Sequence, residues 1–193
     1  QRAVSALAGA DEQKKIGLLA VLGKRGGPNA ANACSRALID GSEAVRIAAV
    51  KACMASGEGD AIRAVAARIG AEQSATVSAT IQRTLVSARG KEINAALAGS
   101  LQSSPAAVKV QCINILAARR ASDQKAAIAA ATRDSDGKVR IAAIEAMGKV
   151  GGPDSLATLA EVATKSSSDA EREAGARAAK AIASRIADPA RHV

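Results

Sequence analysis

Apolar and polar positions recur with a helical period along the chain, and residues 138–149 show the pattern clearly. At about 100° per residue, Lys138, Glu145 and Lys149 fall together on one side of a helix. Arg140 projects from the opposite, apolar side, where an unpaired guanidinium is costly to bury. The pattern therefore predicts an amphipathic helix in which Arg140 requires a partner.

The same pattern returns at a regular interval. Similar helical segments start near residues 14, 45, 77, 108, 139 and 171, at a spacing of 31 or 32 residues. Internal similarity at such a period is typical of solenoids. In each unit a first helical run is followed by a short break rich in Gly, Pro or Ser and then by a second helical run. The sequence predicts an all-α fold, a right-handed α-solenoid (α-α superhelix) of about five helical hairpins with a half repeat at the start and a single terminal helix.

Capping residues indicate where the hairpins begin. Ser42, Asp136 and Ser168 precede first helices as N-caps, and Ser104 before Pro105 is typical of an N-cap with proline at the first helical position. The predicted repeats span 12–42, 43–74, 75–105, 106–136 and 137–168, with a half repeat at 2–9 and a terminal helix at 169–187. We expect one repeat domain over 1–193. Because the chain opens on half a repeat, we also expect it to be a segment of a larger protein.

Two segments carry a recognisable signature, DGSEAVRIAAVKA at 40–52 and DSDGKVRIAAIEA at 134–146. Their shared pattern, D…VR-x-AA-x-x-A, resembles the bacterial HEAT-like repeats of the short type first associated with phycobilisome lyases. The resemblance extends over nearly the whole chain and implies the α-solenoid fold already predicted. The same scaffold is used for many binding tasks, so the resemblance implies a fold more closely than a function.

The resemblance also implies partners for the inward arginines. In such arrays the Arg of the VR pair contacts an Asp in the preceding turn and ties one repeat to the next. The implied pairs are Arg46 with Asp40, and Arg140 with Asp134 or Asp136. The middle units have Ser78 and Lys109 in place of arginine and lack the Asp. We call the series of such pairs along the repeats the ladder. We expect the ladder to be interrupted in the middle units, where packing and the cap at Ser104 must hold the repeats together.

Composition narrows the kind of site that the chain can build. Apolar residues make up 48% of the sequence, but Phe, Tyr and Trp are absent. Small side chains let helices approach closely and are poor material for a deep ligand cavity. The longest apolar stretch, IGLLAVLG, is much shorter than the roughly 20 residues that span a bilayer. We expect no membrane segment, and the compartment stays open: cytoplasmic, or exported if an upstream signal was removed.

Residues for metal or nucleophilic chemistry are few. The chain has three cysteines, Cys34, Cys53 and Cys112, with no CxxC spacing, and one histidine, His192. Zinc sites and Cys/His pairs need several such groups converging in space. We expect buried structural cysteines, with one partly exposed reactive thiol as the alternative. No catalytic residue, metal site or cofactor is predicted, and we expect the chain not to be an enzyme.

Three functions are compatible with the sequence. The favoured one is a non-catalytic protein-protein interaction or scaffolding module, which binds a protein, a peptide or a neighbouring domain mainly through its second helices. A net charge of +9 suggests nucleic-acid or polyanion binding instead, although no recognition motif or stacking aromatic side chain accompanies it. The third is a bilin-lyase-like enzyme, which only the resemblance suggests.

The charge is expected to be sorted by the hairpin topology. Turns inside the hairpins are basic, and turns between hairpins are acidic, so that a stack would carry two opposite edges. Cations near the C-termini of first helices complement the helix dipole, which accounts for part of this pattern. The rest suggests docking of an acidic partner. The candidate partner-binding basic edge is Lys24, Arg25, Arg89, Lys91, Arg119, Arg120 and Lys149.

Overall fold

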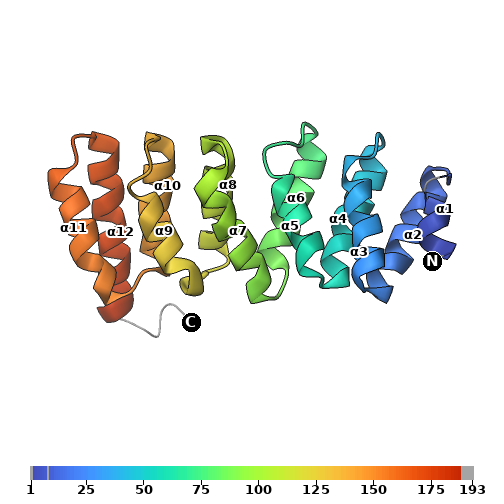
Figure 1. The fold of residues 1–193 in the computed structure, drawn as a ribbon. Helices are drawn as coiled ribbons and strands as arrows, with labels where there is room; N and C mark the ends of the chain where they lie inside the picture. The colour runs from blue at the N-terminus through green and yellow to red at the C-terminus, as the bar shows by residue number, and fades with distance from the viewer. Residues whose placement is uncertain (1, 8, 188–193) are drawn as a thin grey trace. The chain divides into compact units, whose positions relative to one another are not determined.

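The computed structural model describes residues 2–7 and 9–187 of the chain. They form two compact units that divide between Ala96 and Leu97, and each unit is described by itself. Every regular element in the described residues is a helix (Figure 1). This confirms the all-α class of helical hairpins. No helix in the described ranges is long and apolar enough to cross a membrane.

The first unit begins with the short helix of the predicted half repeat and continues in hairpins (Figure 1). Its elements are α1 (Arg2–Leu7), α2 (Glu12–Arg25), α3 (Pro28–Arg36), the 3-10 turn η1 (Ala37–Ile39), α4 (Glu43–Ser56), α5 (Gly59–Ala67), α6 (Ala75–Ser87) and the start of α7 (Lys91–Ser103). The first helices α2 and α4 pack directly against each other. Their second helices α3 and α5 form the other layer of the unit.

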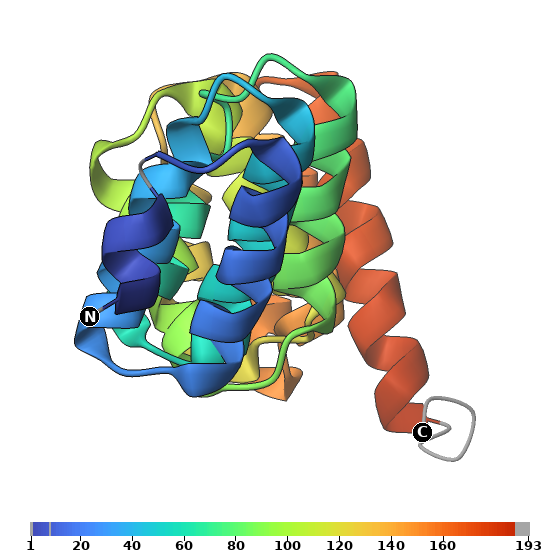
Figure 2. The ribbon, with the colours of Figure 1, turned by 90° about the vertical axis from the view of Figure 1, so that its right-hand side faces the viewer.

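The second unit repeats this arrangement and ends in a single helix. Its elements are the end of α7, α8 (Ala106–Ala118), η2 (Ser122–Gln124), α9 (Lys125–Ala131), α10 (Gly137–Val150), η3 (Pro153–Ser155), α11 (Leu156–Lys165) and α12 (Asp169–Ala187). Figure 2 shows α12 as one continuous helix, and its bounds are those predicted for the terminal helix. It packs against both α10 and α11.

Small residues set how closely the first helices approach. A Cβ atom added at Gly23 of α2 would lie 2.7 Å from the Cα of Ala52 on α4. A Cβ atom added at Gly148 of α10 would lie 2.9 Å from the Cα of Ala178 on α12. Gly23 and Gly148 hold the same position in their repeats. The core without aromatic side chains is thus packed through near contact of helix backbones.

Most first helices begin as the sequence predicts. The side chains of Ser42 and Asp136 accept hydrogen bonds from amides in the first turns of α4 and α10. The prediction of an N-cap at Ser104 is wrong, because Pro105 itself is the N-cap of α8 and no side chain caps that helix. Pro105 has extended backbone angles, with ψ at 152°, so that it stands before the first helical turn instead of inside it.

A side chain two residues before the N-cap closes the turn between hairpins. The Asp40 carboxylate accepts the amide N–H of Ser42 at 2.9 Å. The same contact joins Glu72 to Ser74, Asp134 to Asp136, and Ser166 to Ser168. At the N-cap of α8 it cannot form, because Pro105 has no N–H to donate.

The inward arginines bind both this turn and a carboxylate, but not the carboxylate that was predicted. Nη1 of Arg46 donates to the main-chain oxygen of Asp40 at 2.9 Å. Nε and Nη2 of Arg46 donate to the two carboxylate oxygens of Glu72, at 3.0 and 3.1 Å. The expected ion pair with Asp40 is therefore corrected to a bidentate pair with Glu72, in the following turn.

Arg140 follows the same rule. Nη1 donates to the main-chain oxygens of Asp134 and Ser135, both at 2.9 Å, and Nε donates to Glu171 at 2.8 Å. The predicted pairing with the carboxylate of Asp134 or Asp136 is wrong. Those carboxylates accept main-chain amides inside the turn, so the guanidinium reaches past them to the next repeat.

Lysines continue the ladder at equivalent positions. Nζ of Lys15 lies 2.7 Å from the Asp40 carboxylate, and Nζ of Lys109 lies 2.7 Å from that of Asp134. The prediction that Lys109 interrupts the ladder is thus wrong. Ser78 does interrupt it, since its side chain has no hydrogen-bond partner among the described residues. Each lysine pairs with the aspartate carboxylate of the following turn. Each arginine bonds to main-chain oxygens of its own turn and to a glutamate carboxylate.

Removal of the Arg140 side chain tests how much this contact stabilises the fold. We expect Arg140→Ala to lower the free energy of unfolding by about 1–3 kcal/mol, because Glu171 and two carbonyl oxygens lose their donor. Lys138→Ala is the matched control, because Lys138 is exposed on the same helix and has no side-chain partner there. Urea unfolding measures both variants. Equal midpoints would contradict the stabilising role.

Acid should weaken the turns through their aspartates. The Lys15 ammonium lowers the pKa of Asp40, and the Lys109 ammonium lowers that of Asp134. A carboxyl group whose pKa is lower in the folded state stabilises the fold above its unfolded pKa, about 3.9. This contribution is lost as the pH falls through the folded pKa. Urea unfolding between about pH 2 and pH 6 should therefore show a shallower loss of stability for Asp134→Asn than for the wild type, and unchanged pH dependence would refute this assignment.

Candidate functional site

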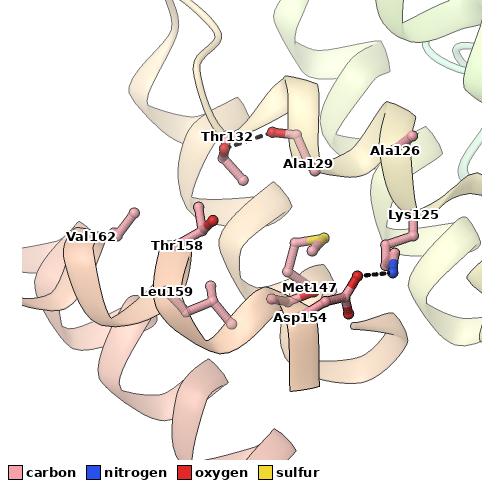
Figure 3. A pocket seen from close by; sticks show the side chains of 10 residues that line it. Lys125, Ala126, Ala129, Thr132, Met147, Asp154, Thr158, Leu159 and Val162 are labelled. Atoms are coloured by element: carbon pink, nitrogen blue, oxygen red, sulfur yellow. Dashed lines mark hydrogen bonds and ion pairs between the residues drawn. The ribbon is translucent and has the colours of Figure 1, made fainter. Parts of the chain in front are cut away.

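A hollow of about 160 Å³ lies between the second helices α9 and α11. Figure 3 shows side chains from both helices pointing into it, with Met147 of α10 between them. Its lining is Lys125, Ala126, Ala129, Thr132, Met147, Asp154, Ser155, Thr158, Leu159 and Val162. The sequence predicted binding through second helices but named none of these residues as a site.

The floor of the hollow is apolar, and three polar side chains of its lining are paired within the protein. Leu159 is 1% exposed and Met147 is 5% exposed. The Thr132 hydroxyl donates to the carbonyl oxygen of Ala129 at 2.7 Å, so it is not left unpaired (Figure 3). Lys125 and Asp154 form an ion pair at one end, which lowers the pKa of Asp154. An apolar group could enter against Thr132, Lys125 and Asp154 without leaving these three side chains unpaired.

The sequence of α9 explains why space remains here. This helix has only seven residues, KAAIAAA, and its single large apolar side chain, Ile128, is fully buried. The alanines on the side facing α11 are too small to fill the gap between the helices. A run of alanine in a second helix is thus the sequence signal for the hollow, although it does not reveal the facing residues.

A second, open hollow of about 350 Å³ lies between the first helices α2 and α4. Ile16, Ala20, Ile47 and Ala48 supply apolar walls, and the exposed Lys24 belongs to the lining. Apart from Lys24 and a second lysine, Lys51, the lining of this hollow consists of alanine and isoleucine. No hydroxyl, amide or carboxylate side chain contributes to it.

The predicted basic-edge residues lie at the turns inside the hairpins, in both units. In the first unit, Lys24 and Arg25 end α2, while Arg89 and Lys91 flank Gly90 between α6 and α7. All four are exposed. Each unit therefore has a basic end of its own, and a single edge through both units stays a prediction.

In the second unit the basic residues are not equivalent. Arg119 is half-buried, and burial lowers its pKa, while the charge of Asp123 acts in the opposite direction. Arg120 and Lys149 are exposed and line a hollow of about 360 Å³. The structure thus brings together two of the three predicted residues of this unit around one space.

Three further residues of this basic hollow, Ala181, Ser184 and Arg185, come from α12 and were missed by the sequence analysis. The complete lining is Ala117, Ala118, Arg120, Lys149, Ala181, Ser184 and Arg185. Nη2 of Arg185 donates to the carbonyl oxygen of Gly151 at 2.7 Å, and Nη1 donates to that of Gly148. Arg185 is held in place by the C-terminal end of α10. No local pattern indicates this contact, which joins residues more than 30 positions apart.

Arg120 has an unusual backbone. Its φ is +51°, the only positive value for a non-glycine residue in the described chain. The amide of Arg120 bonds to the carbonyl of Ala117 at 3.1 Å, and that of Ala121 bonds to Leu116 at 3.0 Å, which closes the end of α8. An L-residue in this left-handed region costs about 1–2 kcal/mol relative to glycine.

The cysteines are buried, as the sequence predicts. Cys34, Cys53 and Cys112 are each 0% exposed and free of disulfides. Burial raises the pKa of Cys53 to about 12 and that of Cys112 to about 11. The alternative of a partly exposed thiol is therefore wrong. Within the ranges 2–7 and 9–187 no cluster of His, Cys, Asp and Glu could hold a metal ion, and His192 lies outside them.

Comparison with known proteins gives a family match for part of the chain. Residues 93–183 match the family model for HEAT repeats. No curated protein matches the chain. Among solved structures, the complex of CpcE and CpcF of phycocyanin lyase from Nostoc sp. PCC7120 is similar at 19% identity and a TM-score of 0.46, covering 89% of this chain and 73% of that one. The match shows that residues 93–183 are similar to HEAT repeats, and helical hairpins are present in both units.

Proposed function

We propose that the chain is a non-catalytic protein-binding module whose hollow between α9 and α11 receives one apolar side chain of a partner. The supporting observation is the buried apolar floor of Met147 and Leu159 beneath a rim on which Thr132, Lys125 and Asp154 are already paired. The partner is a peptide segment of another protein or of a neighbouring domain. Scaffolding then follows from the repeat architecture, which offers further surface beside this anchor.

The size of the hollow limits what it can hold. A cavity of about 150 Å³ accommodates a group the size of benzene, and the hollow here has about 160 Å³. That space suits one leucine, methionine or phenylalanine side chain. Sites for free small molecules are usually larger and have several convergent polar groups. A side chain that is anchored by the rest of a bound peptide needs neither.

The rim favours a peptide over a nucleic acid. Its one lysine, Lys125, is already paired with Asp154, so the hollow offers no spare positive charge to a phosphate. The chain has no aromatic side chain on which a base could stack. Peptide amides and carbonyls can instead bond to the exposed parts of this ion pair and to Thr158, which is the usual polar rim of a protein interface.

The raised pKa values of the buried thiols support a non-catalytic role. With pKa values of about 12 and 11, Cys53 and Cys112 hold almost no thiolate at neutral pH. A thiol in that state is a poor nucleophile. The turn carboxylates Asp40, Glu72 and Asp134 are engaged by main-chain amides and cations, which serves the fold.

Blocking the hollow tests the binding function. Peptides would be selected from a random phage-displayed library against the whole chain and their affinities measured by fluorescence anisotropy. We expect the selected peptides to share one large apolar position. Thr158→Arg should weaken their binding by about tenfold or more, because the long side chain occupies the anchor pocket.

The matched control is Ala157→Arg, which adds the same charge at an adjacent exposed position that does not line the hollow. This variant should bind the peptides as the wild type does. Equal loss in both variants would show that charge alone matters. Failure to enrich any peptide would also overturn the proposal.

The lyase alternative has a separate test. Incubation of the chain with a bilin and an acceptor protein should leave the absorbance spectrum of the mixture equal to that of the mixture without the chain. A new absorbance band that follows the chain's concentration would contradict the non-catalytic assignment.

A further inference from the structure

The strained backbone at Arg120 is not required by the repeat. Gly26 and Gly57 hold the corresponding position in the first two predicted repeats, with φ values of 64° and 69°. Glycine adopts such angles without steric cost. The chain therefore has a simpler solution for this turn and does not use it at residue 120. Strain that the fold does not need indicates a role for the side chain itself.

Helix capping does not account for that role. The end of α8 is already closed by the main-chain bonds of Arg120 and Ala121. At the end of α10, the carbonyl oxygens of Gly148 and Gly151 are occupied by Arg185. The end of α10 thus has a positive charge without the ammonium of Lys149, and main-chain bonds close the end of α8 without the guanidinium of Arg120.

Both of those groups are available to a ligand. Neither the side chain of Arg120 nor that of Lys149 has a hydrogen-bond or ion-pair partner in the part of the chain that the structure describes. Both are exposed, and they line the same hollow of about 360 Å³ together with Arg185. Three cations therefore share a space to which no carboxylate contributes.

The rest of the lining suits a compact anion. Ala117, Ala118 and Ala181 are small and leave the space open, and Ser184 adds a hydroxyl group that can donate a hydrogen bond. Arginine offers a planar fork of N–H donors that matches the oxygens of a phosphate, and lysine adds a point charge. A phosphate group carries about two negative charges at neutral pH, which matches this set better than one carboxylate does.

We propose that the hollow formed by Arg120, Lys149, Ser184 and Arg185 is a binding site for a phosphate group. Arg120 supplies the donor fork, Lys149 the second free charge, and Arg185 a third charge that α10 holds in place. This site is separate from the hollow between α9 and α11 and does not depend on the function proposed there. The group is either free phosphate or a phosphomonoester.

Arg120→Gly separates this role from a structural one. The substitution removes the donor fork and also relieves the positive φ. We expect it to weaken phosphate binding by about tenfold while it raises the urea midpoint of unfolding. Lys149→Ser should weaken binding without raising the midpoint. The control, Lys138→Ser, removes one exposed charge of the same unit at the opposite end of α10 and should leave binding unchanged.

Binding would be followed by chemical shifts of backbone amides in the whole chain, at constant ionic strength. Inorganic phosphate and an O-phosphoserine peptide are the probes, and acetate is the competitor. We expect saturable shifts confined to residues 117–121, 148–151 and 181–185. Tighter binding of the phosphopeptide would identify a phosphorylated partner as the source, and tighter binding of inorganic phosphate would identify the free ion. Equal responses of wild type and Arg120→Gly, or equal binding of acetate, would overturn the site.

Discussion

Both units depend on the contact between a cation of a first helix and the turn between hairpins, and α6, with Ser78 at this position, is the exception. Arg46 shows it most completely: the side chain bonds to a main-chain oxygen of its own turn and to both carboxylate oxygens of Glu72 in the next. The Glu72 carboxylate is 4% exposed and also accepts the amide of Ser74. A buried charge is tolerable only because every part of it is paired. The same contacts satisfy the turn carbonyls, which would otherwise lack donors.

The small residues of the core make this arrangement possible. Where Gly23 and Gly148 bring neighbouring first helices almost into backbone contact, successive turns lie close enough for one side chain to bridge them. A core without aromatic side chains thus allows the close helix packing that the ladder requires. It also determines the kind of site: the short alanine-rich α9 leaves a hollow the size of one side chain. A chain built in this way offers pockets for parts of a partner.

Much of the fold could be predicted because the sequence pattern of each helix recurs in several repeats. The spacing of 31 or 32 residues located every hairpin, and the bounds of α12 agree with the predicted helix. The partners of Arg46 and Arg140 could not be found in this way, because the signature covers one turn while the pairs join two. An acidic residue at 40, 72 and 134 was the available signal for Glu72. Nothing comparable indicated Glu171, which takes the pairing role in a turn where Ser166 replaces the acid.

The candidate hollows were less predictable for a related reason. Arg120 and Lys149 stood out as charged residues at helix ends, yet the contribution of Arg185 arises from packing across two helices. The strain at Arg120 is likewise invisible in the sequence, where it is one of two adjacent arginines. Periodicity predicts which face of a helix is exposed to solvent. It does not predict which exposed residues from different repeats line the same hollow.

The central claim is that the cation of a first helix and the carboxylate of the following turn act as one unit. A double-mutant cycle on Arg46→Ala and Glu72→Ala, measured by urea unfolding of the whole chain, tests it directly. The account predicts a coupling free energy of about 1–3 kcal/mol, since either substitution alone already removes the shared contact. Strictly additive losses, with no coupling between the two sites, would contradict it.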